Sequence, residues 1–182
     1  FRDEDARADR SPGEFYQLDM EMAFASQEDV FTIIEEALPP VFEKYGVYKT
    51  ASKLPFTRIP YLEAMEKYGS DKPDLRIDLT VQDATDVLAD CGFGPFAGNV
   101  VKAIVVDKFT ATRKVIDKIC SDVEVQSGEK AYWFRLDDNG EFVGGISKFL
   151  ADIKEKVIET LGLKPGDFVG LTSGKKLRAQ KT

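Results

Sequence analysis

Two short runs near the start of the chain carry side chains that could bind a polar ligand. Arg2 and Glu4 stand two residues apart, and Phe15, Gln17 and Asp19 follow with the same spacing after a charged segment. Residues two apart point to the same face of a β-strand. An extended backbone would therefore present a guanidinium and a carboxylate on one strand, and a ring, an amide and a carboxylate on the next. This set predicts the floor of a site for a polar ligand.

The segment between these two runs predicts a turn. Residues 5–14 include Arg7 and Arg10 and contain Ser11-Pro12-Gly13, and these three residue types favour turns. We expect two antiparallel strands joined by a charged loop. A half-exposed antiparallel strand that binds nothing would show the same pattern, so the residues alone leave both interpretations open.

The positions after Gln17 describe the other face of the second strand. Leu18, Met20, Met22 and Phe24 alternate with mostly polar residues. A period of two predicts a strand with one buried face. We therefore expect the second strand to continue to about residue 24.

Composition excludes several kinds of chemistry. The 182 residues contain no His, so no imidazole can act as a general base, complete a Ser-His triad or bind zinc. Cys91 and Cys120 lack the spacing of metal ligands, and we predict no metal site within these residues. The net charge of −7 disfavours a general nucleic-acid surface but leaves room for a local one. No apolar run is long enough to span a membrane, and we expect a cytoplasmic protein without a membrane partner.

The rest of the chain predicts helices between paired strands, which is typical of the α+β class. Ser26 and Asp29 form a capping-box signal that begins a helix, and Pro39-Pro40 is expected to kink or divide it. Asn139-Gly140 predicts a β-hairpin. Further helices are expected over 61–68, 81–91, 110–121 and 147–161, and strands over 93–96, 100–106, 132–136, 141–143 and 168–171.

Two phrases of the sequence together resemble a known family. The run FRDEDARADRSPGEFYQLDMEM resembles motif 2 of the class II aminoacyl-tRNA synthetases, in the form of the bacterial aspartyl-tRNA synthetases. The run YGSDKPDLR at residues 68–76 resembles a second phrase of the same enzymes. The resemblance implies that residues 1–76 belong to an antiparallel-sheet catalytic core. It also implies that residues 77–182 form a C-terminally truncated α+β insertion domain, called GAD.

The resemblance implies a reaction and a central residue. Enzymes of this family activate L-aspartate with ATP and Mg²⁺ to aspartyl-adenylate and transfer it to tRNA(Asp), and some also to tRNA(Asn). Arg2 would be the catalytic residue, binding both the α-phosphate and the reacting carboxylate. A guanidinium suits this task because its planar fork binds such groups in a bidentate manner.

The resemblance also assigns the other residues of the hairpin. Phe15 would stack on adenine, and Asp3 and Glu4 would bind the ATP side. Gln17 and Asp19 would bind the ammonium group of aspartate. An anionic partner suits that ammonium group, because opposite charges attract most strongly where water is excluded.

The loop of the hairpin is expected to meet the acceptor end of tRNA through Arg7, Arg10 and Ser11. The usual bacterial loop reads Arg-Gln-Pro-Glu-Phe, whereas this chain has Arg10-Ser11-Pro12-Gly13-Glu14-Phe15. The loop is thus one residue longer and carries Ser where Gln is usual. Ser11 is shorter than Gln, so we do not expect it to make the contacts of that Gln, and we expect Arg10 to be displaced.

Other parts of such an enzyme have no counterpart in the sequence, including motif 1, motif 3 and the anticodon-binding barrel. We expect the chain to be a piece of a longer, homodimeric enzyme and to be inactive alone. The alternative is a non-catalytic RNA- or protein-interaction module with a vestigial motif 2. The retention of Arg2, Glu4, Phe15 and Asp19 favours the enzyme, because a relic has no physical reason to keep all of them.

Overall fold

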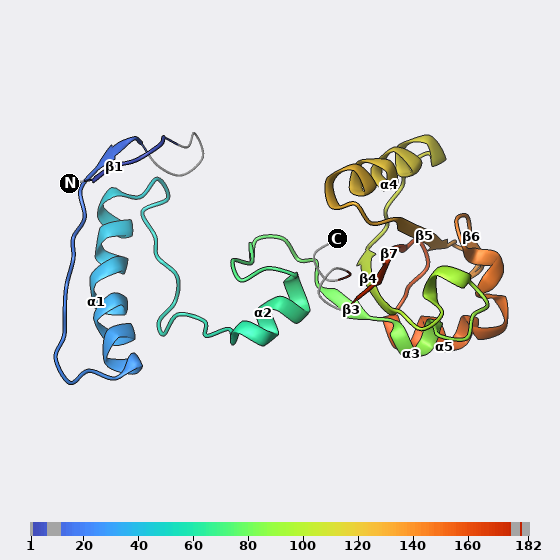
Figure 1. The fold of residues 1–182 in the computed structure, drawn as a ribbon, viewed down its shortest axis with the longest axis horizontal. Coiled ribbons are helices and arrows are strands. Elements are labelled where there is room, and N and C mark those ends of the chain that lie inside the picture. Colours follow the sequence, from blue (N-terminus) through green and yellow to red (C-terminus); the bar gives the residue numbers. More distant parts are fainter. Residues whose placement is uncertain (1, 7–11, 176–178, 180–182) are drawn as a thin grey trace. The chain divides into compact units, whose positions relative to one another are not determined.

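A computed structural model describes residues 2–6, 12–175 and 179 of the chain (Figure 1). The chain divides into two compact units, Phe1–Arg58 and Ile59–Thr182. This division precedes the boundary expected after residue 76, because helix α2 (Tyr61–Tyr68) packs with the second unit. The family assignment of residues 1–76 and 77–182 stays a prediction. None of the described helices is long and apolar enough to cross a membrane.

The first unit begins with the expected hairpin. Strand β1 (Arg2–Asp3) pairs antiparallel with β2 (Glu14–Phe15), and Arg2 lies opposite Phe15. The backbone N–H of Glu4 donates a 2.9 Å hydrogen bond to the carbonyl of Gly13, which extends the pairing by one step toward the loop. The prediction of two antiparallel strands is therefore confirmed.

The predicted continuation of the second strand to residue 24 is wrong. Strand β2 ends at Phe15, and Leu18, Met20 and Phe24 have exposed side chains. Within the described part of the chain, no strand pairs with this segment. An alternating pattern buries one face only when a neighbouring strand and a second layer are present, and without them it does not produce a strand.

Helix α1 (Gln27–Tyr45) begins where the sequence predicted. The Ser26 N–H donates to Asp29 Oδ2 at 2.8 Å, and the Asp29 N–H donates to Ser26 Oγ at 3.4 Å, so both bonds of the capping box form. Pro39 and Pro40 lie inside the helix without dividing it. Each proline removes one backbone donor, and the turns on either side keep theirs.

The second unit is built on a five-stranded antiparallel sheet in the order β3-β4-β7-β5-β6. Its strands are β3 (Val81–Asp83), β4 (Val100–Val106), β5 (Ala131–Leu136), β6 (Phe142–Val143) and β7 (Phe168–Gly174). Its α-helices after α2 are α3 (Thr85–Leu88), α4 (Arg113–Ser127) and α5 (Lys154–Leu161). Short 3₁₀ helices are η1 (Gly94–Phe96), η2 (Ser147–Phe149) and η3 (Ala151–Ile153). The α+β class is confirmed.

The two faces of this sheet are covered differently. One face forms the main core, where Phe134 of β5 and Val169 of β7 are fully buried against Leu88 of α3 and Val157 of α5. The opposite face lies under α4, where Ile116 packs in a smaller cluster with Trp133 and Phe168. Strand alternation explains the division, because neighbouring residues of β5 and β7 point to opposite faces.

Three element predictions in this unit are wrong in part. Residues 81–83 form β3 and not the start of a helix, because they pair with the edge of β4. Residues 94–96 form a 3₁₀ helix, since Pro95 lacks the N–H that a strand ladder needs. The helix expected over 147–161 is regular only from Lys154, after a break at the fully buried Leu150.

The turn after β6 approaches Trp133 so closely that only glycine fits. A Cβ on Gly145 would lie 1.7 Å from the Trp133 carbonyl oxygen, and the residue has a φ of +45°. We predict that Gly145→Ala lowers the free energy of unfolding by about 3 kcal/mol, combining left-handed strain with overpacking. Urea unfolding of the 182-residue chain, followed by the fluorescence of its single tryptophan, measures this loss.

The matched control is Gly128→Ala at the end of α4. Gly128 also has a positive φ, +75°, but nothing lies within 4 Å of the place that its Cβ would occupy. The free energy of unfolding of the Gly128→Ala variant should fall by only about 1–2 kcal/mol, because alanine is strained in the left-handed backbone conformation. Equal losses for the two variants would contradict the close approach at Trp133.

Lys102 of β4 is a buried cation that ties α2 to the sheet. Its side chain is 2% exposed, and its Nζ donates to Glu66 of α2 at 2.5 Å and to Asp83 of β3 at 2.9 Å. Burial opposes the charge, but the hydrogen bonds to both carboxylates outweigh it and raise the pKa of Lys102. These bonds explain why residues 59–76 fold with the second unit.

We predict that removing both carboxylates costs more than removing the lysine. Glu66→Gln with Asp83→Asn leaves a buried, uncompensated ammonium and should cost about 3 kcal/mol of unfolding free energy. Lys102→Met keeps most of the volume and removes the charge, so its cost should stay within about 1 kcal/mol. Urea unfolding followed by tryptophan fluorescence compares the double variant with Lys102→Met. A larger loss of unfolding free energy for Lys102→Met would contradict the role of the two carboxylates in compensating the buried charge.

Candidate functional site

The candidate site of the first unit is built on the β1–β2 hairpin. The Nε of Arg2 donates a 2.6 Å hydrogen bond to Oε1 of Gln17, across the hairpin and two residues beyond Phe15. This bond uses one of the five N–H donors of the guanidinium and fixes the direction of its planar fork. The cross-strand pairing places Arg2 opposite the half-buried Phe15. The structure thus brings together a cation, an amide and a ring.

The three carboxylates of the predicted site, Asp3, Glu4 and Asp19, have exposed side chains. Asp3 lies on β1 beside Arg2, and Glu4 follows at the end of the strand, both with exposed side chains. Asp19 is exposed in an irregular segment, because the strand expected to carry it ends at Phe15. Gln17 and Asp19 therefore do not share a strand face, and of these two residues Gln17 is the one that accepts a hydrogen bond from Arg2.

The loop residues Arg7, Arg10 and Ser11 lie outside the described residues. Their predicted contacts with the acceptor end of tRNA stay a prediction. The described part of the chain contains no group of three or more Cys, Asp or Glu residues arranged to hold a metal ion.

The second phrase of the sequence forms a turn that is held by an ion pair. Helix α2 ends at Gly69 in the left-handed conformation, as predicted, and the turn continues to Arg76. Arg76 Nε and Nη2 donate to the two carboxylate oxygens of Asp74 at 2.8 and 2.5 Å. This bidentate bond, with a backbone bond from Arg76, lowers the pKa of Asp74 from 3.8 to about 2.

Sequence reasoning missed the buried Lys102 with its two carboxylates. The signal was present, because Lys102 is the single charge in a strand whose other six residues are apolar. A lone cation in a buried strand needs partners, and the sequence offers carboxylates in both neighbouring elements. Which of them meet Lys102 depends on the register of β3 against β4, and a single sequence does not determine that register.

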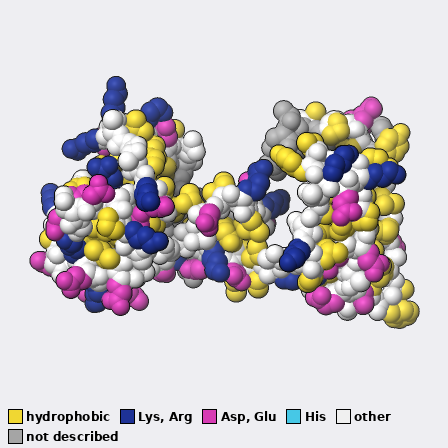
Figure 2. All heavy atoms as spheres, turned by 180° about the vertical axis from the view of Figure 1, so that it is seen from behind, with side chains coloured by type: hydrophobic (Ala, Val, Ile, Leu, Met, Phe, Trp, Pro, Cys, Tyr) yellow, Lys and Arg dark blue, Asp and Glu magenta, His cyan; other side chains and the backbone are white. Residues whose placement is uncertain are grey.

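The two units differ in how much apolar side-chain surface they expose. Apolar side chains of the first unit are widely exposed, among them Tyr16, Val41, Phe42 and Val47 (Figure 2). In the second unit most large apolar side chains lie in the two clusters on either side of the sheet. A soluble domain rarely leaves so much apolar surface uncovered. The first unit therefore has the surface of an incomplete core.

Comparison with known proteins gives a family that is consistent with the α+β elements described above. The chain matches the model of the class II tRNA synthetases (D, K and N) over residues 1–165, and it belongs to this family. Among similar curated proteins, the aspartate–tRNA ligase of Streptomyces griseus is 48% identical over 177 residues, which are 96% of this chain and 29% of the ligase. The aspartate–tRNA(Asp/Asn) ligase of Zymomonas mobilis is 46% identical over 188 residues, 100% of this chain and 31% of the ligase.

The family resemblance drawn from the two phrases is thereby confirmed. The chain spans about 30% of the length of the curated relatives it matches. The alignments cover both compact units, so the second unit belongs to the region that these ligases share. Its specific identity as a GAD domain stays a prediction.

We predict that the unusual acidity of Asp74 depends on Arg76. Carbon-13 NMR of the side-chain carboxyl should give a pKa of about 2 for Asp74. Arg76→Gln removes the two side-chain bonds and should raise that pKa toward its ordinary value, while the backbone bond keeps it partly lowered. Arg113→Gln on α4 is the matched control and should leave Asp74 unchanged. An unshifted titration in the Arg76 variant would show that the ion pair does not form.

Proposed function

We propose that this chain is a segment of an aspartate–tRNA ligase that carries the adenylate-forming motif 2 hairpin. The observation that carries the proposal is the hydrogen bond from Arg2 to Gln17, at 2.6 Å. It holds a cation beside a half-buried aromatic ring on an exposed hairpin. Family membership and the ligase names of the similar proteins support the same assignment.

The proposed first reaction joins aspartate to ATP. A carboxylate oxygen of aspartate attacks the α-phosphorus, the bond to the β-phosphate bridging oxygen breaks, and pyrophosphate leaves. The attacking carboxylate is already ionised at neutral pH, so the step needs no general base. This agrees with a chain that has no histidine.

The chief obstacle to this step is electrostatic, because the attacking carboxylate and the α-phosphate are both anions. A guanidinium between them offsets their repulsion and holds them in line. Arg2 is proposed to perform this task, with Gln17 fixing the direction of its fork. The bond to Nε leaves the Nη groups as the part of the fork that would receive oxygen ligands.

The remaining residues are proposed to bind the substrates. Phe15 stacks on adenine from its place opposite Arg2, and Asp3 and Glu4 line the ATP side. Asp19 receives the ammonium group of aspartate together with the second lone pair of Gln17 Oε1. Since Asp19 lies beyond the end of β2, this role requires the segment after Phe15 to become ordered around the substrate.

We extend the proposal to the substrates and the oligomeric state of the full-length enzyme. A homodimeric, cytoplasmic ligase would use ATP with Mg²⁺ and meet the acceptor end of tRNA through Arg7, Arg10 and Ser11. tRNA(Asp) is the proposed substrate, because both relatives are named as ligases of aspartate to tRNA, and the name of the second one adds tRNA(Asn) to tRNA(Asp). The 182 residues alone are proposed to form no adenylate, because their core surface is incomplete.

Aspartate-dependent ATP–pyrophosphate exchange by the full-length enzyme tests the proposal. We predict that Arg2→Ala lowers the exchange rate at least ~100-fold, about 2.7 kcal/mol of transition-state stabilisation. Gln17→Ala should lower it less, because it removes the group that orients Arg2 and one contact with the ammonium group of aspartate but leaves the guanidinium in place. Measuring kcat and KM separately distinguishes this positioning role from lost binding.

Arg113→Ala is the control for a lost arginine, since its side chain is exposed and pairs only weakly with Asp117, at 3.6 Å. It should exchange at the unaltered rate. A full-length enzyme with no exchange at all would favour the alternative of an interaction module. Normal exchange by Arg2→Ala would remove Arg2 from the chemistry.

A further inference from the structure

The hairpin between β5 and β6 contains the one Asn-Gly pair of the sequence. Asn139 and Gly140 lie in a turn in which the backbone N–H of Asp137 donates to the carbonyl of Glu141 at 2.9 Å. The Asn139 side chain is exposed. Nothing lies within 4 Å of the place that a Cβ on Gly140 would occupy, so the space beside this peptide bond is open. A side-chain amide and an unhindered backbone nitrogen therefore stand next to each other in an exposed turn.

These two groups can react with each other. The backbone nitrogen of Gly140 attacks Cγ of Asn139, the bond from Cγ to the side-chain nitrogen breaks, and a five-membered succinimide ring forms. The proton of the Gly140 N–H passes through water to the leaving nitrogen, which departs as ammonia. Water then opens one of the two ring carbonyls and leaves either aspartate or isoaspartate. Glycine favours ring closure, because it has no side chain to hinder the attacking nitrogen and its backbone rotates freely.

The other asparagine of the sequence lacks these conditions. Asn99 is followed by Val100, a β-branched residue that begins β4 and pairs with Gly174. Its Nδ2 donates to the carbonyl of Pro95 at 3.1 Å, which restrains the side-chain amide. A branched residue in a strand hinders ring closure through both its side chain and its fixed backbone. Since the side chains of Asn99 and Asn139 are both exposed, Asn99 is an internal reference for the reaction.

Asp137 holds the turn in a conformation that slows this reaction. Its carbonyl accepts the N–H of Gly140 at 3.0 Å, and a nitrogen held in that bond is not free to attack. Its carboxylate Oδ1 accepts the N–H groups of Asn139 and Glu141, at 3.0 and 2.7 Å. The bond from Glu141 is the largest cause of a lowered pKa of the Asp137 carboxyl, so the carboxylate keeps its charge at neutral pH. The rate of the reaction therefore depends on how often the turn opens.

We propose that Asn139 is a site of spontaneous deamidation and that Asp137 restrains the reaction by holding the turn closed. The co-reactant is water, and the products are aspartate and isoaspartate at position 139. The proposal concerns the second unit and is independent of the adenylate chemistry proposed for the hairpin of β1 and β2.

Deamidation should loosen this end of the sheet. Isoaspartate adds one carbon atom to the backbone of the turn, whereas the pairing of Arg135 with Val143 depends on the present length of the turn. Either product also adds a negative charge to a turn that already holds the carboxylates of Asp137, Asp138 and Glu141. Like charges at such short separations repel each other and destabilise the closed turn.

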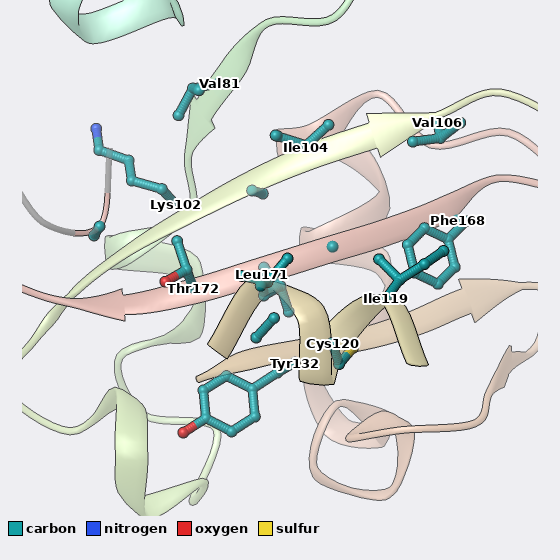
Figure 3. Close-up of a pocket in the computed structure, with 15 residues that line it drawn as sticks. Val81, Lys102, Ile104, Val106, Ile119, Cys120, Tyr132, Phe168, Leu171 and Thr172 are labelled. Atoms are coloured by element: carbon teal, nitrogen blue, oxygen red, sulfur yellow. The ribbon is translucent and has the colours of Figure 1, made fainter. Parts of the chain in front are cut away.

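The single tryptophan reports on this change. Gly144 and Gly145, which follow β6, lie so close to Trp133 that no Cβ would fit at either position. Trp133 stacks on Phe168 of β7, with 5.9 Å between the ring centroids. Figure 3 shows Phe168 on the face of the sheet under α4, next to Ile119 of that helix. A shift of the segment after β6 therefore changes the surroundings of Trp133.

Peptide mapping by mass spectrometry tests the proposal on the 182-residue chain after incubation for several weeks in mildly alkaline buffer. Asn139 should be converted to aspartate and isoaspartate while Asn99 stays intact. The tryptophan fluorescence of the isolated isoaspartate product should differ from that of the unreacted chain. If residue 139 is no more altered than residue 99, the proposal is wrong.

Two variants test the restraint by Asp137. Asp137→Ala removes the acceptor of two backbone hydrogen bonds and should speed the conversion of Asn139 at least ~5-fold. Asp138→Ala removes a neighbouring, exposed carboxylate of the same charge and is the matched control, with an unaltered rate. Amide hydrogen exchange at Gly140 should rise by the same factor as the conversion in Asp137→Ala. Equal conversion rates in the two variants, or faster conversion without faster exchange at Gly140, would overturn the restraint.

The same mapping on a full-length ligase that contains these residues tests the site in the longer protein. Asn139 should again react ahead of Asn99. Conversion in the 182-residue chain alone would mean that further polypeptide covers the turn, and the proposal would be wrong for the enzyme.

Discussion

The pairing of β7 between β4 and β5 is the interaction on which the second unit depends. Seven residue pairs join β7 to β4, and the register sets Lys102 opposite Thr172. Because strand neighbours point to opposite faces, this register sends Val169 and Leu171 into the main core and leaves Gly170 and Thr172 under α4. A slip by one residue would exchange the two sets. The main core and the burial of Lys102 thus follow from one register.

In the first unit, the backbone pairing that positions Arg2 is much shorter than the strand pairing of the second unit. Its hairpin has two residues in each strand, and an isolated two-stranded hairpin is at best marginally stable. The hydrogen bond from Arg2 to Gln17 is therefore a large part of what orients the guanidinium here. An arginine that must bridge two anions benefits from such support, because a fork already aimed at its ligands loses less entropy on binding them. The proposed chemistry needs an oriented Arg2, and the hydrogen bond from Arg2 to Gln17 orients it in the structure.

Local signals in the sequence predicted the elements that depend on local chemistry. The capping box at Ser26, the end of α2 at Gly69 and the Asn139-Gly140 hairpin all form, since neighbouring residues determine them. Two of the predictions that failed needed a distant partner. The alternation from Leu18 to Phe24 has no neighbouring strand in the described chain, and residues 81–83 became a strand through pairing with β4. In the candidate site, the sequence predicted the two antiparallel strands that carry Arg2 and Phe15, but it predicted neither the Arg2–Gln17 hydrogen bond nor the place of Asp19.

Amide hydrogen exchange of the full-length enzyme, with and without a non-hydrolysable aspartyl-adenylate analogue, tests the central claim most directly. If the hairpin holds the adenylate, the analogue should slow exchange at the amides of residues 2–4 and 15–19. Exchange across α4 should be unchanged by the analogue, which provides an internal reference. Protection confined to other parts of the enzyme, with the hairpin amides unaffected, would contradict the assignment of the hairpin as the adenylate site.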